Sequence, residues 1–167
     1  MAWVDSLRGQ IVGLDTTPFI YFIEKYPLYV DMMRSFFRAV EEGDCAVVTS
    51  TITLLETLVL PLRRGDKYIA GRYRSILLKT KGLKMVPMSK EIAEEAAILR
   101  AAYNIHTADS IQMATAIHES ASLFLTNDLR LPSLPNLKVL TLDAIKKDSQ
   151  EKDTQKSNLE NGFSQED

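Results

Sequence analysis

The segment Ile11-Val12-Gly13-Leu14-Asp15-Thr16-Thr17-Pro18 is an apolar run that ends at a carboxylate and continues with two hydroxyls and a proline. Thr17 is of a type that caps helices, and Pro18 suits the first turn of a helix, where its missing N–H is not needed. The segment therefore predicts a buried strand that ends at Asp15, directly before a helix. In an open α/β sheet, ligands bind at that edge. The alternative is that Asp15 is a turn residue bonded to its own backbone.

The composition is that of an ordinary globular protein. The chain has 167 residues, of which 46% are hydrophobic and 25% charged, enough for one domain with a core. Its net charge of −2 gives no overall field that would drive it onto nucleic acid. The single cysteine, Cys45, excludes an internal disulfide and fits a reducing compartment. No apolar run approaches the roughly 20 residues that span a bilayer, and residues 1–10 lack a signal-peptide core. We expect a cytoplasmic protein without membrane association.

Apolar runs alternate with helical patterns along the chain. The runs predict five strands, over residues 12–14, 45–48, 83–86, 123–125 and 139–140. Helical patterns cover residues 19–25, 28–42, 50–61, 66–78, 89–103 and 107–119. Strands that alternate with helices form a parallel sheet covered on both faces. The predicted fold is a three-layer α/β/α sandwich around a central, mostly parallel sheet of about five strands.

The composition changes after Asp143. Residues 146–167 contain only Leu159 and Phe163 as large apolar side chains, and segments this polar do not bury enough surface to fold. We therefore expect one folded domain over residues 1–143 and a disordered C-terminal tail over residues 144–167.

Three further acids accompany Asp15. Glu56 lies on an otherwise apolar helical stripe, where a carboxylate is costly unless it is paired, binds a metal or reaches water at the rim. The other members of that stripe are Ile52, Leu55 and Val59. Asp109 falls in the first turn of a helix, where the dipole alone favours a negative charge by about 0.3–1 kcal/mol. Asp128 follows the strand at residues 123–125, in a stretch that also suits a simple turn.

These four acids are expected to meet at one edge of the sheet. Asp15 and Asp128 should lie at the carboxyl ends of parallel strands, and Glu56 and Asp109 in helices packed over the same edge. Two unit charges roughly 4 Å apart repel by about 4 kcal/mol at an effective dielectric of about 20, so a close cluster needs a cation. All-oxygen ligands select a hard divalent ion such as Mg²⁺ or Mn²⁺. Such an ion can activate water and stabilise charge on a phosphate.

Four sequence pieces in this order resemble the PIN-domain ribonucleases, and most of all the VapC-type toxins. The pieces are Leu14-Asp15-Thr16-Thr17, Thr53-Leu54-Leu55-Glu56, Ala108-Asp109-Ser110-Ile111-Gln112-Met113-Ala114 and Thr126-Asn127-Asp128. The resemblance covers about residues 11–140. It implies a PIN-like fold and an endoribonuclease that needs Mg²⁺ or Mn²⁺, hydrolyses RNA phosphodiester bonds and leaves a 5′-phosphate. It also implies a homodimer and, for toxins, a cognate antitoxin protein that blocks the site.

With this resemblance, each acid has an expected role. Asp15 and Asp109 would be the principal ligands of the ion. Glu56 would hold the ion or orient the attacking water, and Asp128 would complete the site. Two hydroxyl residues would support these ligands by hydrogen bonds, namely Thr17 and Thr126. The position of Thr17 is more often serine or asparagine in the family.

Residues 63–84 concentrate eight basic side chains and only one acid. A local basic face suits contact with phosphates, and the interleaved Tyr68 and Tyr73 are available for stacking on bases or for a dimer interface. An ordinary solvated helix surface is the alternative. The candidate RNA contacts are Arg63, Arg64, Lys67, Arg72 and Arg74. The helices from Thr53 to Leu78 are the expected dimer interface.

Other α/β domains with acidic pockets fit less well. A phosphoacceptor receiver domain needs an aspartate at the end of its third strand, where this chain has Pro87-Met88. A haloacid-dehalogenase phosphatase needs a second aspartate two residues after the first, where this chain has Thr17. Two alternatives stay open: a stand-alone RNA-processing PIN nuclease, and a non-catalytic PIN module that binds RNA or a partner protein.

Overall fold

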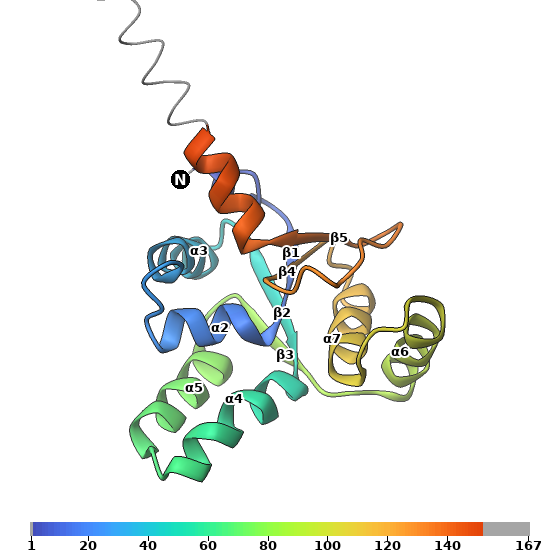
Figure 1. Cartoon of the computed structure of the whole chain (residues 1–167), viewed down its shortest axis with the longest axis horizontal. Coiled ribbons are helices and arrows are strands. Elements are labelled where there is room, and N and C mark those ends of the chain that lie inside the picture. Colours follow the sequence, from blue (N-terminus) through green and yellow to red (C-terminus); the bar gives the residue numbers. More distant parts are fainter. Residues whose placement is uncertain (1, 152–167) are drawn as a thin grey trace, which may run out of the picture.

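The computed structural model describes residues 2–151, which form a five-stranded sheet with helices on both faces (Figure 1). The strands are β1 (Ile11–Leu14), β2 (Ala46–Ser50), β3 (Leu83–Val86), β4 (Leu123–Thr126) and β5 (Lys138–Thr141). The helices are α1 (Ala2–Asp5), α2 (Thr16–Ile23), α3 (Val30–Glu42), α4 (Thr51–Arg64), α5 (Lys67–Lys79), α6 (Lys90–Tyr103) and α7 (Thr107–His118). A last helical segment covers residues 142–151.

The strands follow the order β3-β2-β1-β4-β5, and every neighbouring pair is parallel. The chain therefore builds the sheet from β1 outward to one side and then returns to add β4 and β5 on the other side. The order reverses between β1 and β4, and the crevice outside the carboxyl ends of two such strands is the usual ligand position in open α/β sheets. The predicted α/β sandwich with a parallel sheet is confirmed.

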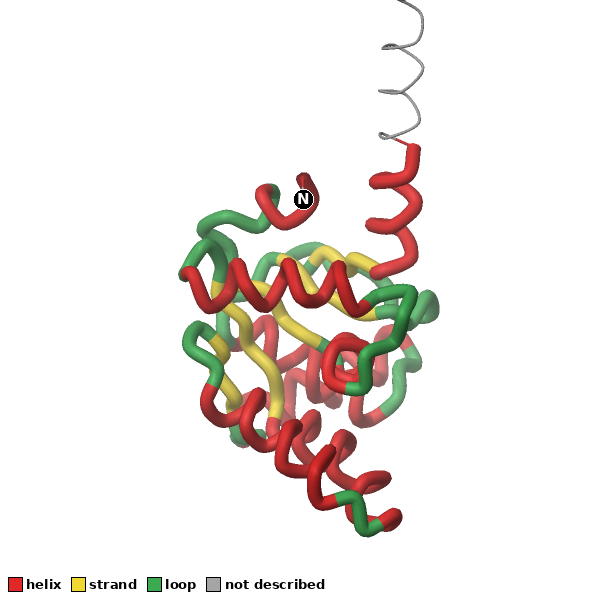
Figure 2. The backbone as a smooth tube through the Cα atoms, turned by 90° about the vertical axis from the view of Figure 1, so that its left-hand side faces the viewer, coloured by secondary structure: helices red, strands yellow, loops and turns green. Residues whose placement is uncertain are grey.

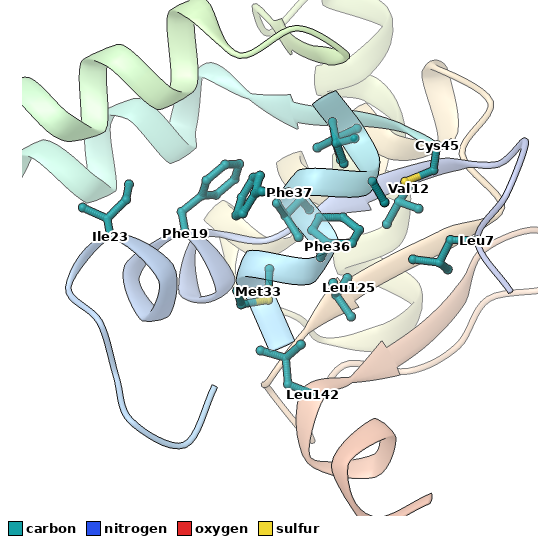
Figure 3. Packing of buried hydrophobic residues seen from close by; sticks show 14 of the residues in the cluster. Leu7, Val12, Phe19, Ile23, Met33, Phe36, Phe37, Cys45, Leu125 and Leu142 are labelled. Atoms are coloured by element: carbon teal, nitrogen blue, oxygen red, sulfur yellow. The ribbon is translucent and has the colours of Figure 1, made fainter. Parts of the chain in front are cut away.

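Two apolar clusters cover the two faces of the sheet. Helices α2 and α3 lie over one face, and α6 and α7 over the other (Figure 1). The first cluster is rich in phenylalanine and includes Phe19, Phe36 and Phe37 (Figure 3). The pair α4 and α5 extends past the sheet, as the view turned by 90° also shows (Figure 2). Among residues 2–151, no helix combines the length and apolar character needed to cross a membrane.

The observed limits of two helices differ from the predicted ranges. Helix α2 begins at Thr16 with Asp15 as its N-cap, so Thr17 already lies inside the helix. Helix α4 passes through Pro61 and ends at Gly65, which adopts a left-handed conformation. Pro61 lacks the N–H that would bond the carbonyl of Thr57, so the helix loses one backbone hydrogen bond there and still continues to Arg64.

Residues 142–151 form a helix, so the first residues of the predicted C-terminal tail are helical. Leu142 and Ile145 are buried in the first apolar cluster. The hydroxyl of Tyr29 donates to Asp143 at 2.5 Å, and the backbone N–H of Asp143 donates to the Asn127 side chain at 3.1 Å. The start of this helix is thus tied to the loop after β4. The rest of the predicted tail, residues 152–167, lies outside the described residues.

The central strand β1 lies directly against α7. A Cβ placed on Gly13 would lie 2.5 Å from the Cβ of Ala116 and 2.8 Å from the ring of Phe124. These distances are far below van der Waals contact, so only glycine lets α7 lie this close to the strand that leads to Asp15.

We predict that Gly13→Ala lowers the free energy of unfolding by about 1–3 kcal/mol, because the added methyl overpacks the β1–α7 contact. Gly71→Ala is the matched control. A Cβ at that position meets nothing within 4 Å, so alanine there should stabilise α5 by roughly 0.5–1 kcal/mol. Thermal or urea unfolding measures both changes. Equal stabilities of Gly13→Ala and the parent protein would contradict this prediction.

Candidate active site

Asp15 lies at the strand-order reversal and is held from two strands. It follows β1, and its side chain is 6% exposed. Its Oδ1 accepts a hydrogen bond from the backbone N–H of Thr16 at 2.6 Å, and its Oδ2 accepts one from the hydroxyl of Thr126 at 2.6 Å. Thr126 ends β4, the parallel neighbour of β1. The carboxylate is therefore fixed in direction by groups from the ends of both strands.

The charge on Asp15 is nevertheless disfavoured. Burial is the largest cause of a raised pKa of Asp15, and the negative charges of Asp109 and Glu56 add to it. Despite the hydrogen bonds from Thr126 and Thr16, which lower it, the pKa rises from its ordinary value of 3.8 to about 6. Three of the predicted acids thus interact electrostatically at one place, and a cation there would relieve the cost.

Asp109 and Asp128 experience opposite environments. Burial raises the pKa of Asp109, and the charge of Asp128 adds to this effect, while His106 and Arg130 oppose it. The guanidinium of Arg130 forms a bidentate pair with Asp128, with Nε 2.9 Å from Oδ1 and an Nη 2.6 Å from Oδ2. This contact lowers the pKa of Asp128. The charge of Asp128 is therefore already paired within the chain.

Glu56 is held by neutral donors. Its Oε2 accepts a hydrogen bond from the hydroxyl of Thr16 at 2.5 Å and one from Nε2 of Gln112 at 3.1 Å. The apolar stripe assigned to it from the sequence is not buried, since Leu55 is 61% and Val59 38% exposed. The buried face of α4 instead carries hydroxyls, so Glu56 lies at the border of a polar face. The buried threonines are Thr53 and Thr57.

Three further residues contact these acids but were missed in the sequence. Thr16 and Gln112 donate to Glu56, and Arg130 pairs with Asp128. A fourth missed residue, Thr53, contacts Thr16 and Gln112. Helical spacing contained part of the signal. Gln112 is three positions after Asp109, and Thr53 is three before Glu56, so each shares a helix face with an acid.

The predicted hydroxyl supports have different outcomes. Thr126 donates to Asp15 as expected. The threonine hydroxyl that reaches Glu56 belongs to Thr16, the neighbour of Thr17. A supporting role of Thr17 stays a prediction.

The donor set suits a hard divalent cation, but its side chains do not form a ready metal cluster. Every candidate ligand is a carboxylate, and the raised pKa of Asp15 marks a place where a positive charge would be favourable. Within residues 2–151, no three His, Cys, Asp or Glu side chains converge closely enough to hold an ion. The chemistry of the donors therefore fits Mg²⁺ or Mn²⁺, while their roles as metal ligands remain a prediction.

The basic candidates divide into exposed and structural residues. Arg72 is half-buried and donates to the backbone carbonyl of Ile23 at 2.9 Å, which ties α5 to α2. Tyr73 is buried and donates to Glu24 at 2.6 Å, so the prediction that it could stack on a base was wrong. Tyr68 is 72% exposed. The candidates that remain exposed are Arg63, Arg64, Lys67 and Arg74.

The chain is thus an α/β domain with an acidic site. In this site a buried carboxylate lies beside further acids, at the strand-order reversal of a parallel sheet. The PIN domain family profile matches residues 12–137, and the chain belongs to this family. No curated protein matches the sequence.

Several solved structures share the fold. VapBC2 from Rickettsia felis, bound to a DNA fragment from its promoter, is 22% identical, with a TM-score of 0.64 over 78% of this chain and 98% of the other. DNA-bound VapBC from Salmonella typhimurium is 17% identical, with a TM-score of 0.58 over 79% and 97%. VapC20 from Mycobacterium tuberculosis, described as a toxin that cleaves the sarcin-ricin loop, is 18% identical, with a TM-score of 0.55 over 68% and 86%.

The raised pKa of Asp15 predicts a specific pH dependence of the metal-free protein. Because the folded pKa exceeds the unfolded one, this group stabilises the fold at low pH, and that contribution is lost as the pH rises from about 4 to about 6. The shift corresponds to about 3 kcal/mol. Asp15→Asn avoids the charge, and the Thr126 hydroxyl can rotate to accept from the new amide. We expect this variant to be more stable than the parent at pH 7 and equally stable near pH 3.

Chemical unfolding in the presence of EDTA, at a series of pH values, measures this difference. The gap between the two proteins should open between about pH 4 and pH 6. A constant gap across the whole series would show that Asp15 does not carry the proposed electrostatic cost.

Proposed function

We propose that this chain is a metal-dependent endoribonuclease that hydrolyses RNA phosphodiester bonds and acts as the toxin of a toxin–antitoxin pair. The observation that carries the proposal is the electrostatic grouping of Asp15, Glu56 and Asp109 at the sheet edge of a PIN domain. The fold alone does not define the activity, so the acids are the main support. The likeness to VapC toxins agrees with this assignment.

In the proposed enzyme, Asp15 and Asp109 hold Mg²⁺ or Mn²⁺, and Glu56 holds the ion or orients the attacking water. When bound, the ion supplies Lewis acidity that offsets the charge growing on the phosphate. The chain itself fixes the direction of Asp15 through Thr126 and the start of α2. Asp128 completes the site and positions the Arg130 guanidinium near Asp109, where a phosphate oxygen could accept from it.

The proposed RNA contacts extend from this site along α4 and α5. Arg63, Arg64, Lys67 and Arg74 are exposed and free to approach phosphates. Tyr68 is the exposed aromatic residue in the same segment and is suited to stacking on an unpaired base. Arg72 has a reduced role, because its guanidinium already bonds the backbone of α2.

We predict that Asp15→Asn and Asp109→Asn, made separately, each lower the rate of RNA cleavage by roughly 100-fold or more, because each removes one charge from a principal metal ligand. The assay uses an end-labelled RNA pool with Mg²⁺ or Mn²⁺, and mapping of product ends should reveal 5′-phosphates. Glu94→Gln, which removes an exposed carboxylate from α6, is the charge-matched control and should cleave at the parental rate.

Three results would redirect the assignment. Parental rates in both aspartate variants would exclude these acids from the chemistry. Metal-dependent RNA binding without cleavage by the parent would favour the non-catalytic PIN module instead. Cleavage in the absence of any toxic effect in cells would favour a stand-alone RNA-processing enzyme.

We further propose that the chain forms a homodimer through α4 and α5 and binds a cognate antitoxin. Helix α4 has an exposed apolar stripe formed by Leu55, Val59 and Leu62, which follow helical spacing. These side chains are 61%, 38% and 58% exposed, respectively. A stripe of this kind is costly in water and suits a protein interface. The solved structures described as VapBC complexes support an antitoxin partner.

The dimer proposal predicts the effect of charges on this stripe. The parent protein should have twice the chain mass of 18.8 kDa in light scattering at micromolar concentration. The double variant Leu55→Glu and Val59→Glu should have the monomer mass, because burying two carboxylates at an apolar interface is unfavourable. Leu129→Glu changes an exposed leucine in the loop after β4 and should leave the dimer intact. A monomeric parent would contradict the proposal.

A further inference from the structure

A buried glutamine on α7 links Glu56 and Thr53 on α4 with Thr16 on α2. Gln112 lies on α7 and is 3% exposed. Its Nε2 lies 2.7 Å from the hydroxyl of Thr16 on α2, 3.1 Å from the hydroxyl of Thr53 on α4, and 3.1 Å from Oε2 of Glu56. A single amide nitrogen therefore faces three acceptors from two other helices.

The direction of the hydrogen bonds shows that this nitrogen must be a donor. The hydroxyl of Thr49 donates to the backbone carbonyl of Leu14 at 2.9 Å, which uses its only hydrogen. Thr53, 2.8 Å from Thr49, must then donate to it, and the oxygen of Thr53 is left to accept. The hydroxyl of Thr16 donates to Glu56, so its oxygen also accepts. Both threonine oxygens can therefore accept from Nε2 of Gln112, whose two N–H hydrogens are shared among the two threonines and Glu56.

The opposite orientation of the amide is excluded by Glu56. It would place the carbonyl oxygen of Gln112 about where Nε2 now lies, 3.1 Å from a carboxylate oxygen, and two acceptors would then face each other. In the observed orientation, Oε1 of Gln112 is buried and has no hydrogen-bond partner within residues 2–151. The chain thus leaves one amide acceptor unpaired so that the donor can reach Glu56 and the two threonines.

The manner of holding Glu56 differs from that of Asp128. Arg130 holds Asp128 with a formal positive charge and lowers its pKa. Gln112 and Thr16 hold Glu56 with neutral donors, which fix its direction without neutralising its charge. A carboxylate held by neutral donors is fixed in direction without a paired cation from those donors, which suits it to bind a metal ion.

We infer that Gln112 is a positioning residue that aims the charged Glu56 carboxylate into the acidic site and aligns Thr16 with it. This inference rests on the proposed nuclease function and extends it to a residue outside the four acids. Gln112 touches neither the ion nor the RNA and acts through Glu56.

The experiment compares full-length parent, Gln112→Met and Gln112→Asn with Thr115→Val as the matched control. Methionine keeps the length of the side chain and removes the donor, whereas asparagine keeps the amide but is one methylene too short. Thr115 is buried on the same helix, and its hydroxyl donates to the backbone carbonyl of Ile111 at 2.7 Å. Binding of Mn²⁺ is measured by calorimetry, and kcat and KM on labelled RNA are measured separately.

We expect both Gln112 variants to lower kcat by about 10–100-fold, to leave KM within about threefold and to weaken Mn²⁺ binding by about 10–100-fold. Thr115→Val should match the parent within about twofold in all three quantities. Thermal unfolding confirms that each variant is folded, and Gln112→Asn decides the question if Gln112→Met does not fold.

The outcomes separate this inference from the proposed function. A parent that neither binds Mn²⁺ nor cleaves RNA overturns the proposed function and this inference with it. An active parent together with Gln112 variants within about twofold of it in kcat and Mn²⁺ affinity overturns only the inference. Equal losses in Gln112→Met and Thr115→Val would show a general packing effect and would also overturn it.

Discussion

The Asp15 carboxylate is buried at the end of the central strand while two further acids lie close enough to raise its pKa. This concentration of negative charge is unfavourable in isolation, and much of the local structure can be understood as a way of tolerating it. The N-terminus of α2 and the hydroxyl of Thr126 donate directly to the carboxylate. The strand order brings these donors together, because β1 and β4 are parallel neighbours that end at the same edge.

Around this carboxylate, the chain uses hydroxyls and an amide where an ordinary core would use apolar side chains. Thr49, Thr53 and Gln112 are all buried and form one connected set of hydrogen bonds that ends on Glu56. A network of neutral groups gains its stability from mutual satisfaction and rigidity rather than from charge pairing. At the outer rim, the exposed side chain of Arg130 supplies a formal counter-charge to Asp128.

Local sequence signals were sufficient for the positions of the strand-end acids. Asp15 and the segment that holds Asp128 directly follow short apolar runs, and the end of a buried strand is a property that a few consecutive residues determine. Helix caps at Ser50 and Ser89 were predictable for the same reason. The family resemblance added the expected roles of the four acids in metal binding and catalysis.

The signals failed where burial depends on distant parts of the chain or on a partner. The leucine and valine side chains of α4 predicted a buried stripe, yet Leu55 and Val59 are exposed and the threonine face is buried. Periodicity gives the spacing of a stripe but not the direction in which it faces. Gln112 was missed because its three partners come from elements far away in the sequence.

The anchoring of the last helical segment has a practical consequence for shortening the chain. Asp143 is bonded to Tyr29 and, through its backbone, to Asn127, the neighbour of Asp128. A truncation at the compositional boundary would remove Ile145 and most of the turn that supports these bonds. The loop that carries Asp128 would then lose the hydrogen bonds that support it. A shortened protein that folds well would therefore hold Asp128 in a different position.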